Sequence, residues 1–217
     1  MSFANRKDAG ARLAAALAGY RGKCPIVIAL PRGGVVVAAE IAKSLDAPLD
    51  LLLVQKIGVP FQPELAMGAI VDGPEPTIVR NENVIRQVEI HDAEFSAICM
   101  AQQAEIDRRK RLYLGDRNNV PLAGRVVIVV DDGIATGSTV KAALKAIRKQ
   151  GPQELVLAVP VAPAGSLEEL ERDVDALICL EAPFFFRAVG HFYADFRQVS
   201  DAEVISALEA ANQSGAA

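Results

Sequence analysis

Short runs of apolar residues rich in Val, Ile and Leu recur along the chain, and segments with helical spacing separate them. The runs lie at residues 26–30, 49–54, 126–130, 155–161 and 176–180. Because they are continuous rather than alternating, they are typical of strands that are covered on both faces. Helical patterns lie between them at residues 35–45, 138–150 and 165–172. The pattern predicts an α/β fold with an open, mostly parallel sheet flanked by helices.

The segment 81–116 interrupts this alternation. It contains no strand-like run, but it has apolar residues at helical spacing, namely Ile85, Val88, Phe95, Ile98 and Ile106. We therefore expect one domain over residues 1–217 with a helical insertion at about 81–116, which could be a lid or a dimer arm.

The most informative stretch follows the apolar run 126–130. It reads Asp131-Asp132-Gly133-Ile134-Ala135-Thr136-Gly137-Ser138-Thr139 and leads directly into a predicted helix. A buried strand thus carries two carboxylates at its C-terminal end, where ligands of open α/β sheets bind. The N–H groups of such a loop and of the helix start can surround a phosphate. The pattern predicts adjacent sites for an anion and a cation.

Two familiar phosphate loops are excluded by residue identity. A Walker A loop needs a Lys before its Ser or Thr, whereas Gly137 is followed here by Ser138. The dinucleotide fingerprint Gly-x-Gly-x-x-Gly is also missing from this loop. The alternative that Asp131 and Asp132 only cap the next helix is disfavoured, because the whole pattern is far more specific than any single residue.

A second loop, Pro31-Arg32-Gly33-Gly34, joins the first apolar run to a predicted helix. The glycines allow close approach of the backbone, and Arg32 offers a planar fork of donors for phosphate oxygens. Taken alone, this tetrapeptide fits a plain strand–helix turn equally well. Lys56 follows the run 49–54, where it is either a binding residue or a solvated strand end.

Together these stretches resemble the type I phosphoribosyltransferases, whose binding motif for phosphoribosyl pyrophosphate (PRPP) is an apolar run, two acidic residues and a loop ending in Thr-Gly-x-Thr. The resemblance covers residues 25–205. Pro-Arg-Gly-Gly, Lys-x-Gly-x-Pro-x-x-Pro-Glu-x-Ala-x-Gly-Ala and Val-Gly-x-x-Tyr-x-Asp-Phe are similar to motifs of a bacterial subfamily. The resemblance implies the type I phosphoribosyltransferase fold.

The resemblance also implies roles for individual residues. Asp131 and Asp132 would hold the 2- and 3-hydroxyls of ribose, with Mg²⁺ near them. The remaining PRPP-binding loop would consist of Gly133, Ile134, Ala135, Thr136, Gly137, Ser138 and Thr139, the last five around the 5-phosphate. Pro31, Arg32, Gly33 and Gly34 would form the pyrophosphate loop. Lys56 would contact pyrophosphate from a mobile loop.

The implied reaction is transfer of the 5-phosphoribosyl group to a nitrogenous acceptor with release of pyrophosphate. Arg32, Lys56, Asp131 and Asp132 are the candidate catalytic residues. Both carboxylates are expected at a solvent-facing strand end, so replacing them with Asn should weaken binding and leave the fold intact.

The acceptor is not identified by any motif. In 6-oxopurine enzymes of the family an Asp precedes the motif's Thr, and Ala135 in that position disfavours hypoxanthine and guanine; the loop is closer to those of adenine and uracil enzymes. Six of the eleven Phe and Tyr residues lie between Phe184 and Phe196. They could stack on a base in a C-terminal hood at about 182–205, or they could pack in the core.

Composition narrows the setting. A net charge of −4 disfavours general binding of nucleic acid, which depends on clustered Lys and Arg. The basic cluster Arg108–Arg111 is interpreted as a salt-bridged helix face beside Glu105. No apolar run is long enough for a signal peptide or a membrane span, so we expect a cytoplasmic enzyme. Its partners would be PRPP and a small nitrogenous acceptor, with homo-oligomerisation left open.

Two other functions remain open. A regulatory module of the same fold would bind PRPP without turnover and contact nucleic acid or a protein through the basic helix. A hydrolase would use water as the acceptor, although no residue is dedicated to that reaction.

Overall fold

The computed structural model describes residues 2–73, 76–115, 117 and 119–214. They form two compact units. The larger contains the described residues of Met1–Leu51 and Asn119–Ala217, and the smaller those of Leu52–Asn118. Each unit is described by itself, and the single domain over residues 1–217 stays a prediction.

The larger unit is built on five parallel strands in the order β2-β1-β6-β7-β8. Their bounds are β1 Ile26–Ala29, β2 Leu49–Leu51, β6 Val126–Val130, β7 Glu154–Val161 and β8 Ala176–Glu181. All five residues of the central strand β6 are buried, as its unbroken apolar run predicts. The α/β fold with a parallel sheet is confirmed.

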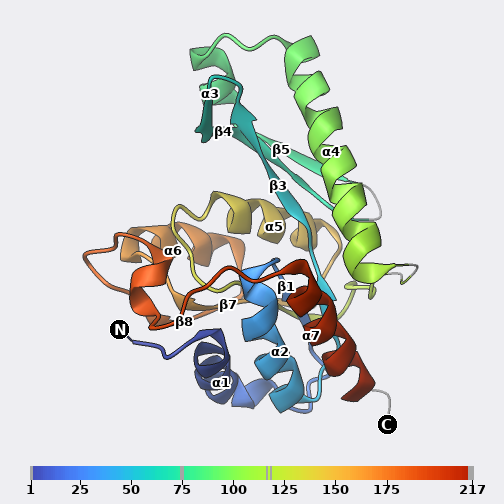
Figure 1. The fold of residues 1–217 in the computed structure, drawn as a ribbon, viewed down its shortest axis with the longest axis vertical. Coiled ribbons are helices and arrows are strands. Elements are labelled where there is room, and N and C mark those ends of the chain that lie inside the picture. Colours follow the sequence, from blue (N-terminus) through green and yellow to red (C-terminus); the bar gives the residue numbers. More distant parts are fainter. Residues whose placement is uncertain (1, 74–75, 116, 118, 215–217) are drawn as a thin grey trace. The chain divides into compact units, whose positions relative to one another are not determined.

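Helices cover both faces of this sheet, with α1, α2 and α7 on one side and α5 and α6 on the other (Figure 1). Their bounds are α1 Arg6–Ala16, α2 Gly33–Leu45, α5 Ser138–Lys149, α6 Ala164–Leu170 and α7 Asp201–Ser214, with short 3-10 turns at Ala18–Tyr20 (η1), Glu171–Asp173 (η2) and Val189–Phe192 (η3). The helical spacing in the sequence predicts α2, α5 and α6, but α1 and α7 were not foreseen.

The connections place a topological switch point in this sheet. The chain passes from β1 through α2 to β2 on one side, whereas β6 lies on the other side of β1 and continues to β7 and β8. Ligands of open α/β sheets bind outside the carboxyl ends of the strands at such a point. The loops that follow β1 and β6 therefore occupy the expected ligand position.

The smaller unit consists of a three-stranded antiparallel sheet in the order β3-β4-β5 and two helices. The bounds are β3 Val54–Val59, β4 Gln62–Val71, β5 Thr77–Arg80, α3 Glu82–Gln87 and α4 Asp92–Leu114. The two helices lie where helical spacing was found, although residue 116, the last of the expected insertion, lies outside the described residues. The antiparallel sheet was not predicted.

One predicted strand and one predicted loop were wrong. The apolar run 49–54 is not a single strand, because β2 ends at Leu51 and β3 begins at Val54 in a different sheet. The segment after it is the antiparallel hairpin of β3 and β4, with an irregular register around Gly58, rather than a loop. Backbone hydrogen bonds across this hairpin decided its structure, and a continuous apolar run carries no sign of where one sheet ends and another begins.

Among the helices that the structure describes, none combines the length and apolar character needed to cross a bilayer. The cysteines are free thiols, with Cys99 buried, Cys179 half-buried and Cys24 exposed.

Candidate active site

The two loops singled out in the sequence come together at the switch point. β1 and β6 are neighbours in parallel register, with Ala29 opposite Val130, and the N–H of Leu30 donates to the carbonyl of Val130 at 2.9 Å. A side chain at Gly34 would begin 2.8 Å from the Val130 carbonyl oxygen and 3.0 Å from Asp131 Cα. The loops 31–34 and 131–137 are thus packed against each other.

Gly33 is required by its neighbour in the other loop. A Cβ atom there would lie 1.9 Å from Asp132 Oδ2 and 2.9 Å from Arg6 Nε. Both distances are too short for any real contact, so the carboxylate occupies the space that a side chain would need. The sequence predicts that the glycines allow close approach of the backbone. The structure shows such an approach at Gly33, and the close neighbour is Asp132 of the same chain.

The loop after the two aspartates has the form of an anion site. Gly137 adopts a left-handed conformation with φ of 74° directly before α5, and Ser138 is the first residue of that helix. Thr136 and Ser138 are exposed, with their hydroxyl oxygens 3.3 Å apart. Below them, buried Ile134 donates its N–H to the Val161 carbonyl at 2.9 Å. Hydroxyls and a helix N-terminus on an anchored loop suit a phosphate group.

The two carboxylates are less accessible than the sequence suggested. Both residues are half-buried, and only 15% of the Asp132 side chain is exposed. Burial raises the pKa of Asp131 well above its ordinary value, and the charge of Asp132 adds to the effect. Burial also raises the pKa of Asp132, although Arg6 opposes that shift. The expectation of a solvent-facing strand end was wrong, because α1 and the 193–197 segment cover Asp132.

Arg6 and Tyr193 contact Asp132 and were missed as site residues. Arg6, the first residue of α1, donates from Nε to Asp132 Oδ2 at 2.6 Å. The Tyr193 hydroxyl donates to the Asp132 backbone carbonyl at 2.6 Å. The sequence marks Tyr193 only as one member of an aromatic group. No sequence signal marks Arg6, because its partner lies 126 positions away.

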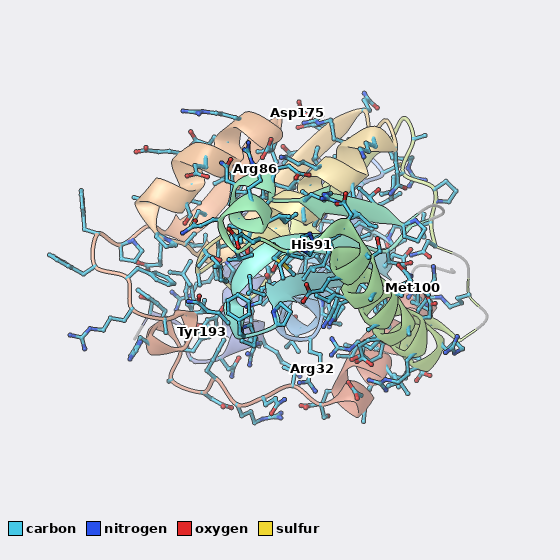
Figure 2. The ribbon with its side chains drawn as sticks, turned by 90° about the horizontal axis from the view of Figure 1, so that it is seen from above. Arg32, Arg86, His91, Met100, Asp175 and Tyr193 are labelled. Carbon is cyan, nitrogen blue, oxygen red and sulfur yellow. The ribbon has the colours of Figure 1, made fainter. Side chains whose placement is uncertain are left out.

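Arg32 stands at the start of α2 with little to restrain it. The Pro31–Arg32 peptide bond is cis. The guanidinium lies close to the start of α7 (Figure 2), with its NH1 atom 3.8 Å from Asp201 Oδ1, and the two side chains are 36% and 43% exposed. Ion pairs between exposed side chains at such a distance contribute little to the stability of the folded protein. Arg32 is therefore accessible to an anion at this loop.

Lys56 belongs to the other unit. It lies in β3, opposite Ala69 of β4, and not in a mobile loop. Its contact with pyrophosphate therefore stays a prediction.

The aromatic group divides into two parts. Phe184 and Phe185 are each 96% exposed, in the segment after β8. By contrast, Tyr193 is buried, its ring 5.3 Å from that of Phe3 and 4.9 Å from that of Phe196. Packing, the alternative considered from sequence, therefore applies to Tyr193, and the exposed pair remains the candidate for stacking.

The basic cluster of α4 is paired with carboxylates. Glu105 accepts from Arg108 and Arg109 at 2.7–2.9 Å, and these bonds lower its pKa to about 2. Lys110 forms an ion pair with buried Asp72 at 3.1 Å. The interpretation of a salt-bridged helix face is confirmed for these residues.

The residues present fit a magnesium ion only in combination with a substrate. Among the residues that the structure describes, no three His, Cys, Asp or Glu side chains gather into a metal site. Mg²⁺ commonly takes only one or two carboxylates and completes its shell with water and substrate phosphates. The half-buried pair Asp131 and Asp132 beside an anion loop is consistent with that mode.

Comparisons with known proteins agree with this geometry. The family described as "Phosphoribosyl transferase domain" matches residues 3–196. Two relatives named "Putative phosphoribosyl transferase", from Mycobacterium tuberculosis strains CDC 1551 / Oshkosh and ATCC 25618 / H37Rv, are 46% identical over 211 residues, 97% of this chain and 47% of each relative. The chain thus spans about half the length of these curated relatives.

A solved structure covers the whole fold. The crystal structure of TT1426 from Thermus thermophilus is similar with a TM-score of 0.82 and 39% identity, over 96% of this chain and 98% of that one. From the two loops at the switch point and the family match over residues 3–196, we conclude that this chain belongs to the phosphoribosyl transferase domain family.

Proposed function

We propose that this chain transfers the 5-phosphoribosyl group of PRPP, with Mg²⁺, to a nitrogenous acceptor and releases pyrophosphate. The observation that carries the proposal is the meeting of two loops at the switch point, one with the features of a phosphate site and the other with an accessible Arg32, with a pair of carboxylates between them. A ligand with a phosphate at one end, a sugar in the middle and a pyrophosphate at the other matches this order.

Each part of PRPP has a proposed partner. The loop 135–139 would take the 5-phosphate through its N–H groups and hydroxyls. Asp131 and Asp132 would accept hydrogen bonds from the ribose hydroxyls. The loop 31–34, with Arg32, would hold the pyrophosphate. When bound, Mg²⁺ would supply positive charge to the pyrophosphate oxygens, with Asp131 and Asp132 as its nearest carboxylates.

The chemistry then needs no covalent nucleophile. The bond from ribose C1 to the pyrophosphate oxygen breaks and leaves an electron-poor ribosyl centre, and the acceptor nitrogen forms the new bond to C1 from the opposite face. Arg32 stabilises the negative charge that develops on the leaving oxygen, while the carboxylates and the phosphate loop hold the sugar in place. Lys56 is a second candidate residue for contact with the leaving pyrophosphate.

The acceptor is proposed to be a planar nitrogenous base other than hypoxanthine or guanine. Ala135 stands where 6-oxopurine enzymes have an Asp, and the exposed rings of Phe184 and Phe185 offer faces for stacking.

An acceptor panel tests the proposal directly. The protein is incubated with PRPP, Mg²⁺ and a series of purine, pyrimidine and pyridine bases, and release of pyrophosphate is measured. We expect release with at least one base and much less with hypoxanthine or guanine. PRPP binding without turnover for any base would instead favour a regulatory module, and release without any base would indicate hydrolysis.

Replacement of Arg32 distinguishes catalysis from simple binding. Arg32→Ala should lower kcat by about a hundredfold, since a charge-assisted contact to the leaving group strengthens as the bond breaks and is typically worth about 2–4 kcal/mol. Affinity for PRPP should fall less than kcat does. Steady-state kinetics with the best acceptor provide both values.

Two companion variants control this measurement. Arg32→Lys keeps the charge but not the planar fork and should give an intermediate kcat. Asp201→Asn removes the exposed partner of Arg32 and should leave kcat near that of the wild type, because that 3.8 Å pair is weak. Normal turnover by Arg32→Ala would contradict its role at the leaving group.

A further inference from the structure

The N-terminal segment is joined to the segment that follows η3. The N–H groups of Ser2 and Phe3 donate to the Phe192 carbonyl at 2.9 Å, and the N–H of Ala194 donates to the Phe3 carbonyl at 2.8 Å. Phe3 and Tyr193 also form a parallel β-bridge. Two distant parts of the chain therefore act as one support, and this support sets the position of the first turn of α1.

Arg6 projects from that first turn to the carboxylate pair. Its Nε donates to Asp132 Oδ2 at 2.6 Å, and the two side chains are 10% and 15% exposed. The low exposure of both side chains distinguishes this pair from the ion pairs at the surface, because shielding from water strengthens a charge-assisted bond.

The Arg6 guanidinium has two further contacts. Its NH1 donates to the Arg197 carbonyl at 2.8 Å, and its Cζ lies 3.9 Å from the centre of the Phe196 ring. Arg6 is thereby held by a hydrogen bond, an aromatic face and an ion pair at once. Three such contacts leave the guanidinium one orientation toward Asp132.

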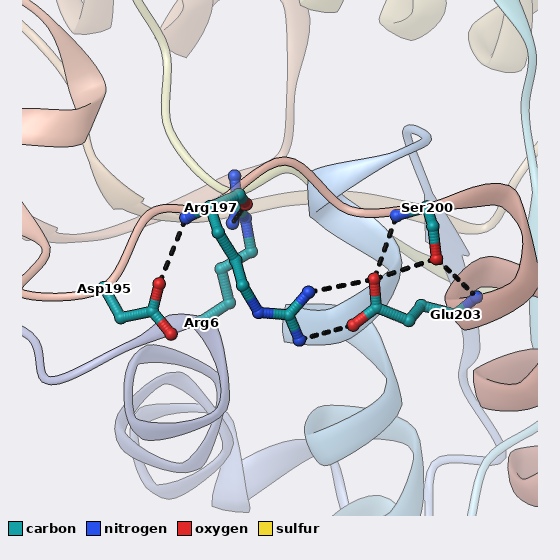
Figure 3. A network of polar contacts seen from close by, with 5 residues as sticks. All are labelled: Arg6, Asp195, Arg197, Ser200 and Glu203. Atoms are coloured by element: carbon teal, nitrogen blue, oxygen red, sulfur yellow. Dashed lines mark hydrogen bonds and ion pairs between the residues drawn. The ribbon is translucent and has the colours of Figure 1, made fainter.

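The segment that holds Arg6 is itself fixed. Figure 3 shows Arg197 between Asp195 and Glu203, with its backbone beside Arg6. The N–H of Arg197 donates to Asp195 Oδ1 at 3.1 Å, and its guanidinium binds both oxygens of Glu203. Glu203 in turn accepts from the N–H of Ser200 at 2.9 Å, at the start of α7. The Arg197 carbonyl, which accepts the hydrogen bond from Arg6, therefore belongs to a segment that this network holds in place.

We propose that Arg6 is a positioning residue for Asp132. By binding Oδ2, Arg6 fixes the plane of the carboxylate that accepts a hydrogen bond from a ribose hydroxyl of PRPP. The absence of a side chain at Gly33 makes the room that this pair needs. The inference rests on the proposed function, and it adds that the N-terminal helix, outside both recognised loops, completes the sugar site.

The test measures PRPP binding in the presence of Mg²⁺ by calorimetry, together with thermal stability, for the full chain and three variants. Arg6→Ala should weaken PRPP binding by about 10–100-fold, the usual effect of removing a group that orients a binding residue. Arg6→Lys, which keeps the charge without the fork, should lose less. Guanidinium at a few millimolar, well below denaturing concentrations, should restore part of the binding by Arg6→Ala.

The matched control is Arg12→Ala. Arg12 lies on the same helix, pairs with Asp8 at 3.1 Å and stacks 5.3 Å from the Phe3 ring, but its side chain is 51% exposed and contacts neither Asp131 nor Asp132. Its removal should leave PRPP affinity unchanged, and guanidinium should have no effect on it. This control separates loss of an arginine on α1 from loss of the contact to Asp132.

The outcomes can be told apart. Wild-type affinity in folded Arg6→Ala, or a variant that guanidinium stabilises against heat without restoring PRPP binding, would show that Arg6 is only structural. If Arg6→Ala does not fold, Arg6→Lys decides, since wild-type affinity in that variant would also overturn the inference. If the wild type itself does not bind PRPP, the proposed function fails and the inference fails with it.

Discussion

Asp131→Asn and Asp132→Asn are both expected to weaken PRPP binding by about a hundredfold or more, while differing in their effect on the stability of the unliganded protein. Each substitution removes a charged acceptor for a ribose hydroxyl. The difference in stability arises because only Asp132 has a cationic partner, Arg6, at 2.6 Å.

Asp131→Asn should raise the melting temperature. Burial and the neighbouring charge of Asp132 raise the pKa of Asp131 in the folded protein. The folded state therefore binds this proton more tightly than the unfolded state, so the free energy of unfolding decreases as the pH rises from the unfolded pKa toward the folded one. An amide has no charge to bury, and the variant should lack this decrease.

Asp132→Asn should be less stable than Asp131→Asn, because both variants lose a buried charge but only this one leaves the guanidinium of Arg6 without a negative partner in a poorly solvated place, a loss of about 1–3 kcal/mol. The remaining contacts of Arg6 to Arg197 and Phe196 limit the loss. The asymmetry between the two variants is a property of the fold, because the two residues are adjacent and identical in the sequence.

Thermal unfolding between pH 4 and pH 8, with and without PRPP and Mg²⁺, checks both variants. The difference in melting temperature between wild type and Asp131→Asn should widen as the pH rises. PRPP should stabilise the wild type and neither variant. Equal destabilisation by the two substitutions would contradict the assignment of Arg6 to Asp132, and wild-type affinity in either would remove that carboxylate from the site.

Gly33→Ala should disrupt the site as severely as the loss of a carboxylate. A methyl group at Gly33 would begin 1.9 Å from Asp132 Oδ2, so Asp132 or the loop 31–34 must move. Forcing atoms into a filled space costs about 1–3 kcal/mol. We expect that loss of stability, and a fall in PRPP affinity of about a hundredfold, because the displacement separates Asp132 from Arg6 and shifts the pyrophosphate loop.

Gly165→Ala is the matched control. Gly165 lies in α6 of the same unit, and a Cβ atom there would meet nothing within 4 Å. Alanine favours a helix over glycine by about 1 kcal/mol, so this variant should be as stable as the wild type or more so, with normal PRPP binding. Calorimetry and thermal unfolding of both variants give the comparison, and wild-type affinity in Gly33→Ala would refute the contact.

Much of the larger unit was predictable from local sequence pattern. Continuous apolar runs indicate strands that are covered on both faces. All five runs contain a strand of the parallel sheet, four of them at nearly the expected positions and the run 49–54 only over Leu49–Leu51. Parallel strands place their carboxyl ends on one edge of a sheet, so the loops after β1 and β6 were expected to meet. The motifs in these two loops can be recognised from sequence because each lies within a few consecutive residues.

Contacts between distant segments were decided only by the tertiary structure. Arg6 looks like any charged residue near a helix start, and only the packing of α1 beside the 193–197 segment brings it to Asp132. The opposite environments of Phe184 and Tyr193, exposed and buried, have the same origin. Likewise, the break of the apolar run after Leu51 follows from strand pairing. Side-chain type limits what a residue can bind, but long-range packing decides which partner it meets.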